Sequence, residues 1–308
     1  MTDAAPQVPQ PSEPTVTPPR PWIAALLSVL VAGLGQLYSG RAIRGAAVFG
    51  LVVLANLLVL VMAVAIPAPL QLPVIVLGSL VLLALAAIDA ARTANSAGST
   101  YRRHRYNHWY VYVAIFVVFN LVVGPALIHE VKAHIVDAFR ITSGAMQPTL
   151  MEGDHVFVVP TTVIHRGDAV VHERGTQRFL HRAIGLPFDT VEMRSGEVFI
   201  NGIRYPEPYA QPVRANENVQ LDEAKWQRDY LVQGTDTSHY RPTMKDWGPL
   251  VVPAASYFLL GDNRGESWDS RALGFVPRSS ISARATTIYF SKDPDTGIRW
   301  NRMGLPVH

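Results

Sequence analysis

Uninterrupted apolar runs fill most of the first 128 residues of the chain. No charged residue occurs from Gly45 to Ile88, a stretch too long for one membrane span and about right for two spans of ~20 residues joined by a tight turn. Another run begins with Trp109 and Tyr110, which are typical of the level at which a helix leaves a membrane. The pattern predicts transmembrane segments at about 45–66, 73–92 and 109–128. Three prolines mark the first turn: Pro67, Pro69 and Pro73.

A shorter apolar segment at 22–38 precedes these three and contains Gly33 and Gly35. It is either a fourth span, which places the N-terminus outside, or a re-entrant or interfacial segment, which places it inside. Residues 1–21 are rich in Pro, Thr and Gln and predict a disordered tail, because they cannot bury enough apolar surface to offset ordering. They are not expected to be a signal peptide, since the apolar run that follows lacks a basic start and a small-residue cleavage site.

Positive charge in the short loops predicts the orientation of these segments. The loop between 73–92 and 109–128 carries four arginines, which are Arg92, Arg102, Arg103 and Arg105. Such an excess of arginine is typical of a cytoplasmic loop, and Arg41 and Arg44 agree with an inside position. The chain is therefore expected to be an integral protein of the cytoplasmic (inner) membrane, with everything after Ile128 on the outer face.

Beyond residue 140 the apolar residues form short alternating runs with turn signals between them, the period of half-buried strands. Examples are "HVFVVP", "DAVVHE", "RFLHRAIGL", "EVFING" and "SYFLLGD". The expected fold class is an α-helical transmembrane region, residues 22–128, followed by an all-β extracytoplasmic domain, residues 129–308. Residues 203–250, with several prolines and a charged stretch, are expected to be an insertion in that domain.

Composition narrows the classes of protein. The chain has 308 residues and is 49% hydrophobic with a mean hydropathy of +0.15, more apolar than a soluble core requires. The net charge is only +3 and there is no basic face with interleaved aromatic residues, so nucleic acid is not an expected partner. Cysteine is absent, which excludes disulfides and thiolate metal sites.

A dense group of charges in "GDNRGESWDSRALGFVP" (261–277) is a candidate for chemistry. Its charged residues are Asp262, Arg264, Glu266, Asp269 and Arg271. The group is either a solvated surface turn or a buried scaffold in which bidentate pairs of arginine and carboxylate fix a site.

His181 lies in an apolar run between Leu180 and Arg182. It is either a structural histidine with a satisfied hydrogen bond or a general base, because its pKa range suits the deprotonation of a serine hydroxyl. The other histidines of this half show no metal-ligand spacing; they are His155, His165, His172 and His239. No metal and no cofactor is expected.

Four stretches, in order and in spacing, resemble the conserved boxes of type I signal peptidases (leader peptidases, serine protease family S26), the membrane-bound endopeptidases that remove signal peptides from exported proteins. "FRITSGAMQPTL" resembles the family's serine box, F-x-I-P-S-G-S-M-x-P-T-L. "RGDAVV" is similar to the strand that follows it, "HRAIGLPFDTVE" to the general-base box, and "GDNRGESWDSRALGFVP" to the last box. The similarity covers about residues 109–290.

The resemblance implies a role for each matching position. Ala145 stands where the family has its nucleophilic serine, and His181 stands at the general-base position, which is a lysine in most bacterial members and a histidine in archaeal and endoplasmic-reticulum members. Ser143 matches a residue that helps to hold the oxyanion, and Ser267 one that orients the base. The positions that shape the pockets for small substrate side chains are Phe139, Ile141, Met146 and Leu150. The supporting charged positions are Arg182, Asp262, Arg264, Asp269 and Arg271.

Three positions depart from the family pattern in a way that matters: His181, which has a precedent within the wider family, Phe188 and Ala145. An acyl-enzyme cannot form without an attacking oxygen, which Ala145 lacks. The hypotheses are an engineered Ser to Ala change, a natural pseudoprotease, and rescue by another oxygen, with Ser143 first. Phe188 replaces the glycine of L-P-G-D and strains the turn if that position needs a positive φ.

The resemblance as a whole implies a signal-peptidase-I-like membrane protein, whose family reaction is the endoproteolytic removal of signal peptides after Ala-x-Ala-type sites. The alternative is an inactive pseudoprotease that acts as a binding or assembly factor. The expected partners are the signal peptides of exported preproteins and the lipid bilayer. A transporter or channel built on residues 22–128 is disfavoured, because the apolar runs hold no charged residues inside.

Overall fold

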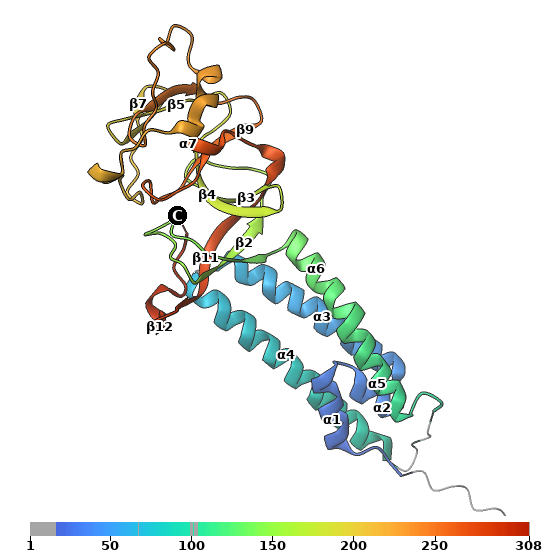
Figure 1. The fold of residues 1–308 in the computed structure, drawn as a ribbon. Coiled ribbons are helices and arrows are strands. Elements are labelled where there is room, and N and C mark those ends of the chain that lie inside the picture. Colours follow the sequence, from blue (N-terminus) through green and yellow to red (C-terminus); the bar gives the residue numbers. More distant parts are fainter. Residues whose placement is uncertain (1–16, 67, 99–100, 102–103, 308) are drawn as a thin grey trace, which may run out of the picture. The chain divides into compact units, whose positions relative to one another are not determined.

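The computed structural model describes residues 17–66, 68–98, 101 and 104–307. The chain divides into two compact units (Figure 1). The helical unit comprises Met1–Ile66 and Pro73–Leu127, and the β unit comprises Pro67–Leu72 and Ile128–His308. Most of the predicted tail, up to residue 16, lies outside the described residues, as do Arg102 and Arg103 of the loop used to predict the orientation.

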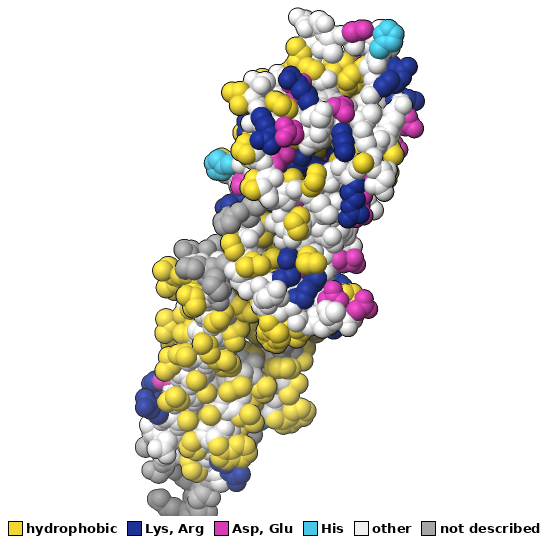
Figure 2. Space-filling view, turned by 90° about the vertical axis from the view of Figure 1, so that its left-hand side faces the viewer, with side chains coloured by type: hydrophobic (Ala, Val, Ile, Leu, Met, Phe, Trp, Pro, Cys, Tyr) yellow, Lys and Arg dark blue, Asp and Glu magenta, His cyan; other side chains and the backbone are white. Residues whose placement is uncertain are grey.

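Apolar helices form the first part of the chain. They are α1 (Pro21–Leu30), α2 (Leu34–Tyr38), α3 (Ala42–Ala65), α4 (Ala68–Ala97), α5 (Trp109–Val118), the π-helical turn η2 (Phe119–Val123) and α6 (Gly124–His134). Within the described residues, three stretches are long and apolar enough to cross a membrane by length and composition: Ala42–Ala63, Leu70–Ala97 and Trp109–His134. Figure 2 shows hydrophobic side chains covering these helices, whereas charged side chains gather on the β unit. Such an apolar surface suits lipid rather than water.

The segment at 22–38 is two short helices rather than one. Gly33, with φ of 95°, lies in the turn between them, and the Gly35 N–H donates a hydrogen bond to Ser28 Oγ at 3.1 Å. A Cβ added to Gly33 would lie 2.3 Å from the carbonyl oxygen of Gly45, so only glycine lets α3 approach this turn so closely. With 10 residues, α1 is too short to cross a bilayer alone.

Pro73 lies inside α4, so its predicted place in the turn was wrong. The helix begins at Ala68, while Pro67 lies outside the described residues. A proline near the start of a membrane helix removes one backbone hydrogen bond, which the surrounding structure tolerates. The apolar helix therefore continues through the proline that the sequence pattern treats as a break.

Asp89 places a carboxylate within α4 and inside the predicted span 73–92, so the expectation that the apolar runs hold no charged residues was wrong. Asp89 accepts hydrogen bonds from Gln36 Nε2 at 2.9 Å and from Arg44 Nε at 3.2 Å. Charged groups in apolar helix bundles are tolerated when they have such partners. The contact ties α2, α3 and α4 together.

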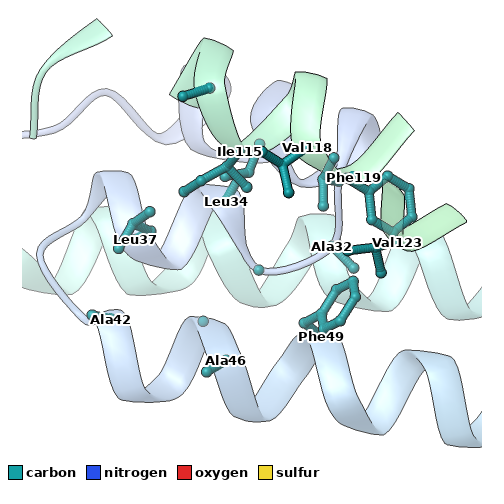
Figure 3. A pocket seen from close by; sticks show the side chains of 14 residues that line it. Ala32, Leu34, Leu37, Ala42, Ala46, Phe49, Ile115, Val118, Phe119 and Val123 are labelled. Carbon is teal, nitrogen blue, oxygen red and sulfur yellow. The ribbon is translucent and has the colours of Figure 1, made fainter. Parts of the chain in front are cut away.

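An apolar cavity of 460 Å³ lies within the helical unit (Figure 3). Phe49 of α3 and Phe119 of η2 meet in it edge to face, with ring centroids 5.8 Å apart. All its described lining residues are apolar, so it offers no group for chemistry.

Two antiparallel sheets form the β unit (Figure 1). The larger has the order β1-β2-β11-β3-β4-β9-β10, with β12 paired to β11. Its strands are β1 (Asp137–Arg140), β2 (Asp154–Pro160), β3 (Ala169–Arg174), β4 (Gln177–Gly185), β9 (Ser256–Leu260), β10 (Val276–Pro277), β11 (Ile281–Asp293) and β12 (Gly297–Ile298). The smaller, in the order β7-β6-β5-β8, contains β5 (Thr190–Arg194), β6 (Glu197–Ile200), β7 (Ile203–Arg204) and β8 (Trp247–Val251). This helical region followed by an antiparallel β domain confirms the expected fold class.

Residues 203–250 are anchored in the core of the smaller sheet. The stretch starts with β7 and ends in β8. Between them, Leu221 and Ala224 are buried in the same apolar cluster as Trp247 and Phe258. The expected insertion therefore shares the core of the β unit.

Phe188 occupies a turn that favours glycine. Its φ is 72° and its side chain is 75% exposed, so it gains little from burial. The turn is held by the backbone N–H of Leu186, which donates to Asp189 Oδ2 at 2.7 Å. A side chain other than glycine in this left-handed region is strained.

We expect Phe188→Gly to raise the free energy of unfolding by about 0.5–1 kcal/mol, because relief of the left-handed strain exceeds the entropy that glycine adds to the unfolded chain. Denaturant unfolding of the full chain in detergent measures it. Phe188→Ala is the matched control and should bring no gain, since alanine keeps the strain. An equal gain in both variants would contradict this account.

Candidate active site

The loop that carries Ala145 is fixed by the turn after β9. Asn263 donates its backbone N–H to the Ala145 carbonyl oxygen at 3.0 Å and its Nδ2 to the Gly144 carbonyl oxygen at 3.1 Å. A Cβ added to Gly261 would lie 2.5 Å from the Ala145 oxygen, so this close approach requires glycine. The 261–263 turn therefore sets where Ala145 lies.

His181, on β4, is buried and contacts a second buried histidine. Its Nδ1 lies 3.0 Å from Nε2 of His172, on β3. The ring of Phe179 stacks on both imidazoles, at interplanar angles of 21° to His172 and 17° to His181. Because His172 pairs with Phe179 and Val170 with His181, the three rings share one face of the β3–β4 hairpin.

Both imidazoles are neutral at physiological pH. Burial, followed by the charges of His181 and Arg174, lowers the pKa of His172 from 6.5 to about 3. Burial is also the largest cause that lowers the pKa of His181; Asp269 opposes it and Arg271 adds to it. A neutral His181 keeps one ring nitrogen unprotonated, as a general base requires.

A cavity of 470 Å³ brings the Ala145 loop and His181 together; we call it the Ala145 cavity. Ser143, Ala145 and His181 all line it. Its apolar lining includes Phe139, Ile141 and Met146, as well as Phe179 and Trp268, which the sequence did not single out. Leu150 is instead fully buried in the core, with 0% exposed.

His181 also lines a second cavity, of 330 Å³, which we call the His172 cavity. His172, Asp269 and Ser270 contribute to it. The paired imidazoles therefore reach two separate spaces.

A buried ion pair joins β4 to the charged stretch at 261–277. Arg182 donates to Asp262 at 2.8 and 2.6 Å, and both side chains are 0% exposed. The Thr149 hydroxyl donates to the same carboxylate at 2.6 Å, and the Tyr209 ring lies 3.9 Å from the guanidinium carbon. This bidentate arrangement fixes direction as well as charge.

Two further buried pairs complete this scaffold. Arg264 donates to Glu207 at 2.7 and 2.6 Å, and Arg271 donates to Asp269 at 2.9 and 2.8 Å. Burial alone raises the pKa of Asp269, but the charge and hydrogen bonds of Arg271 bring it below its usual value. The cluster is therefore a buried scaffold rather than a solvated turn, except for the exposed Glu266.

The two serines suggested by the resemblance lie near the site without bonding to its base. Within the described residues, neither Ser143 nor Ser267 makes a hydrogen bond with His181. Ser143 is exposed, whereas Ser267 Oγ is buried and without a hydrogen-bond partner in the described part of the chain. Their roles stay predictions.

Sequence reasoning missed His172 and Glu207. His172 could have been found from the hairpin register around Gly175, which makes it a diagonal neighbour of His181. Glu207 carries no local signal, because its partner lies 57 residues away in the chain. Across the residues that the structure describes, no group of three or more His, Asp or Glu could hold a metal ion.

Comparisons with known proteins find relatives of this chain by sequence. The family described as "Signal peptidase, peptidase S26" matches residues 109–290. The signal peptidase I of Bacillus licheniformis is 30% identical over 200 residues, covering 62% of this chain and 92% of that protein. Signal peptidase I S of Bacillus subtilis (strain 168) is 31% identical over 175 residues, covering 55% and 85%.

A crystal structure of a signal peptidase I from Enterococcus faecalis V583 is 30% identical, covers 40% of this chain and 97% of that one, and has a TM-score of 0.27. The family and sequence matches confirm the resemblance carried by the four boxes. Together with the three apolar helices, they make the chain a membrane protein.

The buried histidines predict a loss of stability in mild acid. His172 is neutral in the folded chain down to about pH 3, but in the unfolded chain it binds a proton below about 6.5. Its contribution is therefore fully present above pH 6.5 and is lost as the pH falls toward 3, by up to about 1.4 kcal/mol per pH unit.

Denaturant unfolding between pH 4.5 and 6 measures this slope. His172→Gln should lower this slope by the contribution of about one bound proton. His165→Gln, at a side chain that is 76% exposed, should leave the slope unchanged. Equal slopes in the native chain and in His172→Gln would contradict the burial of a neutral His172.

Removing the carboxylate of the buried Arg182–Asp262 pair should strongly destabilise the folded chain. We expect Asp262→Asn to lower the free energy of unfolding by about 3–5 kcal/mol, because Arg182 is left as a buried charge without its partner. The matched control is Glu197→Gln, which breaks the exposed pair with Arg204 and should change it by less than about 1 kcal/mol. Similar losses of unfolding free energy in both variants would contradict the structural role of the buried Arg182–Asp262 pair.

Proposed function

Because the chain belongs to the signal peptidase family, peptidase S26, we propose that its β unit recognises the signal peptides of exported preproteins in the Ala145 cavity, at Ala-x-Ala-type sites. The single observation that carries this proposal is the convergence of the family's boxes on one cavity. The nucleophile-position loop and the base-position strand both line it. The buried Arg182–Asp262 pair joins the base-position strand to the last box.

The shape of the site supports an extended peptide as the ligand. β1 lies at the end of the larger sheet's strand order, so one of its edges has no strand partner in that order. Phe139 of this strand and Met146 both line the cavity. A peptide that adds to a sheet edge uses its backbone for affinity and places alternate side chains into pockets. Alternating small residues, as in Ala-x-Ala, fit this mode.

The chemistry at position 145 separates recognition from cleavage. Ala145 offers a methyl group where the family attacks the peptide carbonyl, so no acyl-enzyme forms there. We therefore propose that the native chain is a pseudoprotease, which binds signal peptides without cutting them at the family's rate. A second candidate is cleavage by Ser143, favoured by its place in the same cavity as a neutral His181.

The membrane placement is part of the proposal. Arg105 falls between the second and third candidate spans, and Arg92 lies in the last two turns of the second, which supports a cytoplasmic loop there. The β unit then faces the outer side of the cytoplasmic membrane, where the processing sites of exported preproteins emerge.

A cleavage and binding assay tests the function. Full-length native chain, Ala145→Ser and Ser143→Ala are each mixed in detergent with a preprotein. We expect native chain and Ser143→Ala to bind it uncut, and Ala145→Ser to cut it several orders of magnitude faster, since loss of a nucleophile costs about a millionfold in a worked serine protease.

Cleavage by the native chain that disappears in Ser143→Ala would support the second candidate instead. If the native chain does not bind the preprotein and Ala145→Ser does not cut it, both candidate functions are contradicted. A preprotein with bulky residues in place of Ala-x-Ala is the matched substrate control and should neither bind nor be cut.

A further inference from the structure

We propose that His172 is the positioning residue of His181, accepting a hydrogen bond from its Nδ1–H so that its Nε2 stays unprotonated toward the Ala145 cavity. The inference rests on the proposed function, in which this cavity receives the peptide. It adds a side chain outside the four family boxes to the site. The distance between His172 Nε2 and His181 Nδ1 is 3.0 Å, within hydrogen-bond range.

Protonation of His181 requires such an acceptor. A base that takes a proton on Nε2 carries N–H groups on both ring nitrogens, and a buried Nδ1–H without an acceptor costs roughly 1–3 kcal/mol. His172 can accept the hydrogen bond because its own ring is neutral, and the ring is only 2% exposed. The ring that carries the other nitrogen of His172 lines the His172 cavity.

The carboxylates near the two histidines, Asp269 and Asp262, already accept hydrogen bonds from other groups. Both oxygens of Asp269 accept hydrogen bonds, Oδ1 from Arg271 and Oδ2 from Arg271 and the Gly261 N–H. Asp262 is likewise held by Arg182 and Thr149. These carboxylates supply charge to His181, while His172 supplies the hydrogen bond.

Aromatic packing fixes the planes of both rings. Phe179 lies with its centroid 5.5 Å from that of His172 and 6.1 Å from that of His181. Among the side chains that the structure describes, His172 is the one that shares a hydrogen bond with His181. Arg174 adds a positive charge near His172, which further disfavours protonation there.

Nitrogen-15 NMR of histidine-labelled full chain in detergent tests the tautomer without any turnover. We expect His181 to be protonated on Nδ1 in the native chain and in His172→Gln, whose Oε1 can accept the same bond. His172→Phe and His172→Leu cannot accept it, and His181 should then change tautomer. The exposed control His165→Gln should change nothing. Protonation on Nε2 in the native chain, or no change in either non-accepting variant, would overturn the proposal.

Cleavage kinetics in the Ala145→Ser background give a second test of the role of His172. His172→Phe should lower kcat roughly 10²-fold with KM unchanged, the size of a general-base contribution, and His172→Gln should restore most of it. If the native chain does not bind the preprotein and Ala145→Ser cuts nothing, the proposed function fails while the NMR result still decides this inference. If Ala145→Ser cuts and His172→Phe leaves kcat unchanged, the inference fails and the proposed function stands.

Discussion

The buried ion pair between Arg182 and Asp262 is the constraint on which the site depends. Arg182 follows the base-position histidine on β4, and Asp262 lies between the two residues, Gly261 and Asn263, that fix the Ala145 loop. One bidentate contact therefore sets the distance between a strand and a loop that are far apart in the sequence. Because both groups are fully desolvated, the pair fixes geometry more than it adds net stability.

Around that pair lie the nucleophile and general-base positions that the family resemblance assigns to Ala145 and His181. His181 is buried, neutral and bonded to His172, and the cavity before it retains an apolar lining beside Ala145. Under the proposed function, the missing hydroxyl removes the covalent step while the cavity still holds an extended peptide.

The sequence predicted those parts that depend on local pattern. Apolar runs and alternation gave the helical region and the β domain, and the four boxes identified Ala145 and His181. It misplaced Pro73, because helix continuity through a proline depends on the surrounding apolar medium. It missed His172, whose hydrogen bond to His181 depends on the register of β3 and β4. It also missed Glu207, which lies far in the sequence from its partner Arg264 and contacts it only in the folded chain. The Glu207–Arg264 pairing is the long-range one, and pairing of that kind leaves no periodic trace in a sequence.

Photo-crosslinking tests the central claim, that the Ala145 cavity receives signal peptides, most directly. A photoreactive residue is placed at the −1 position of a preprotein, the full native chain is irradiated with it, and the attachment site is mapped by mass spectrometry. The account predicts attachment to cavity residues such as Met146 or Trp268. Attachment confined to the helices of residues 22–128, or no attachment at all, would contradict it.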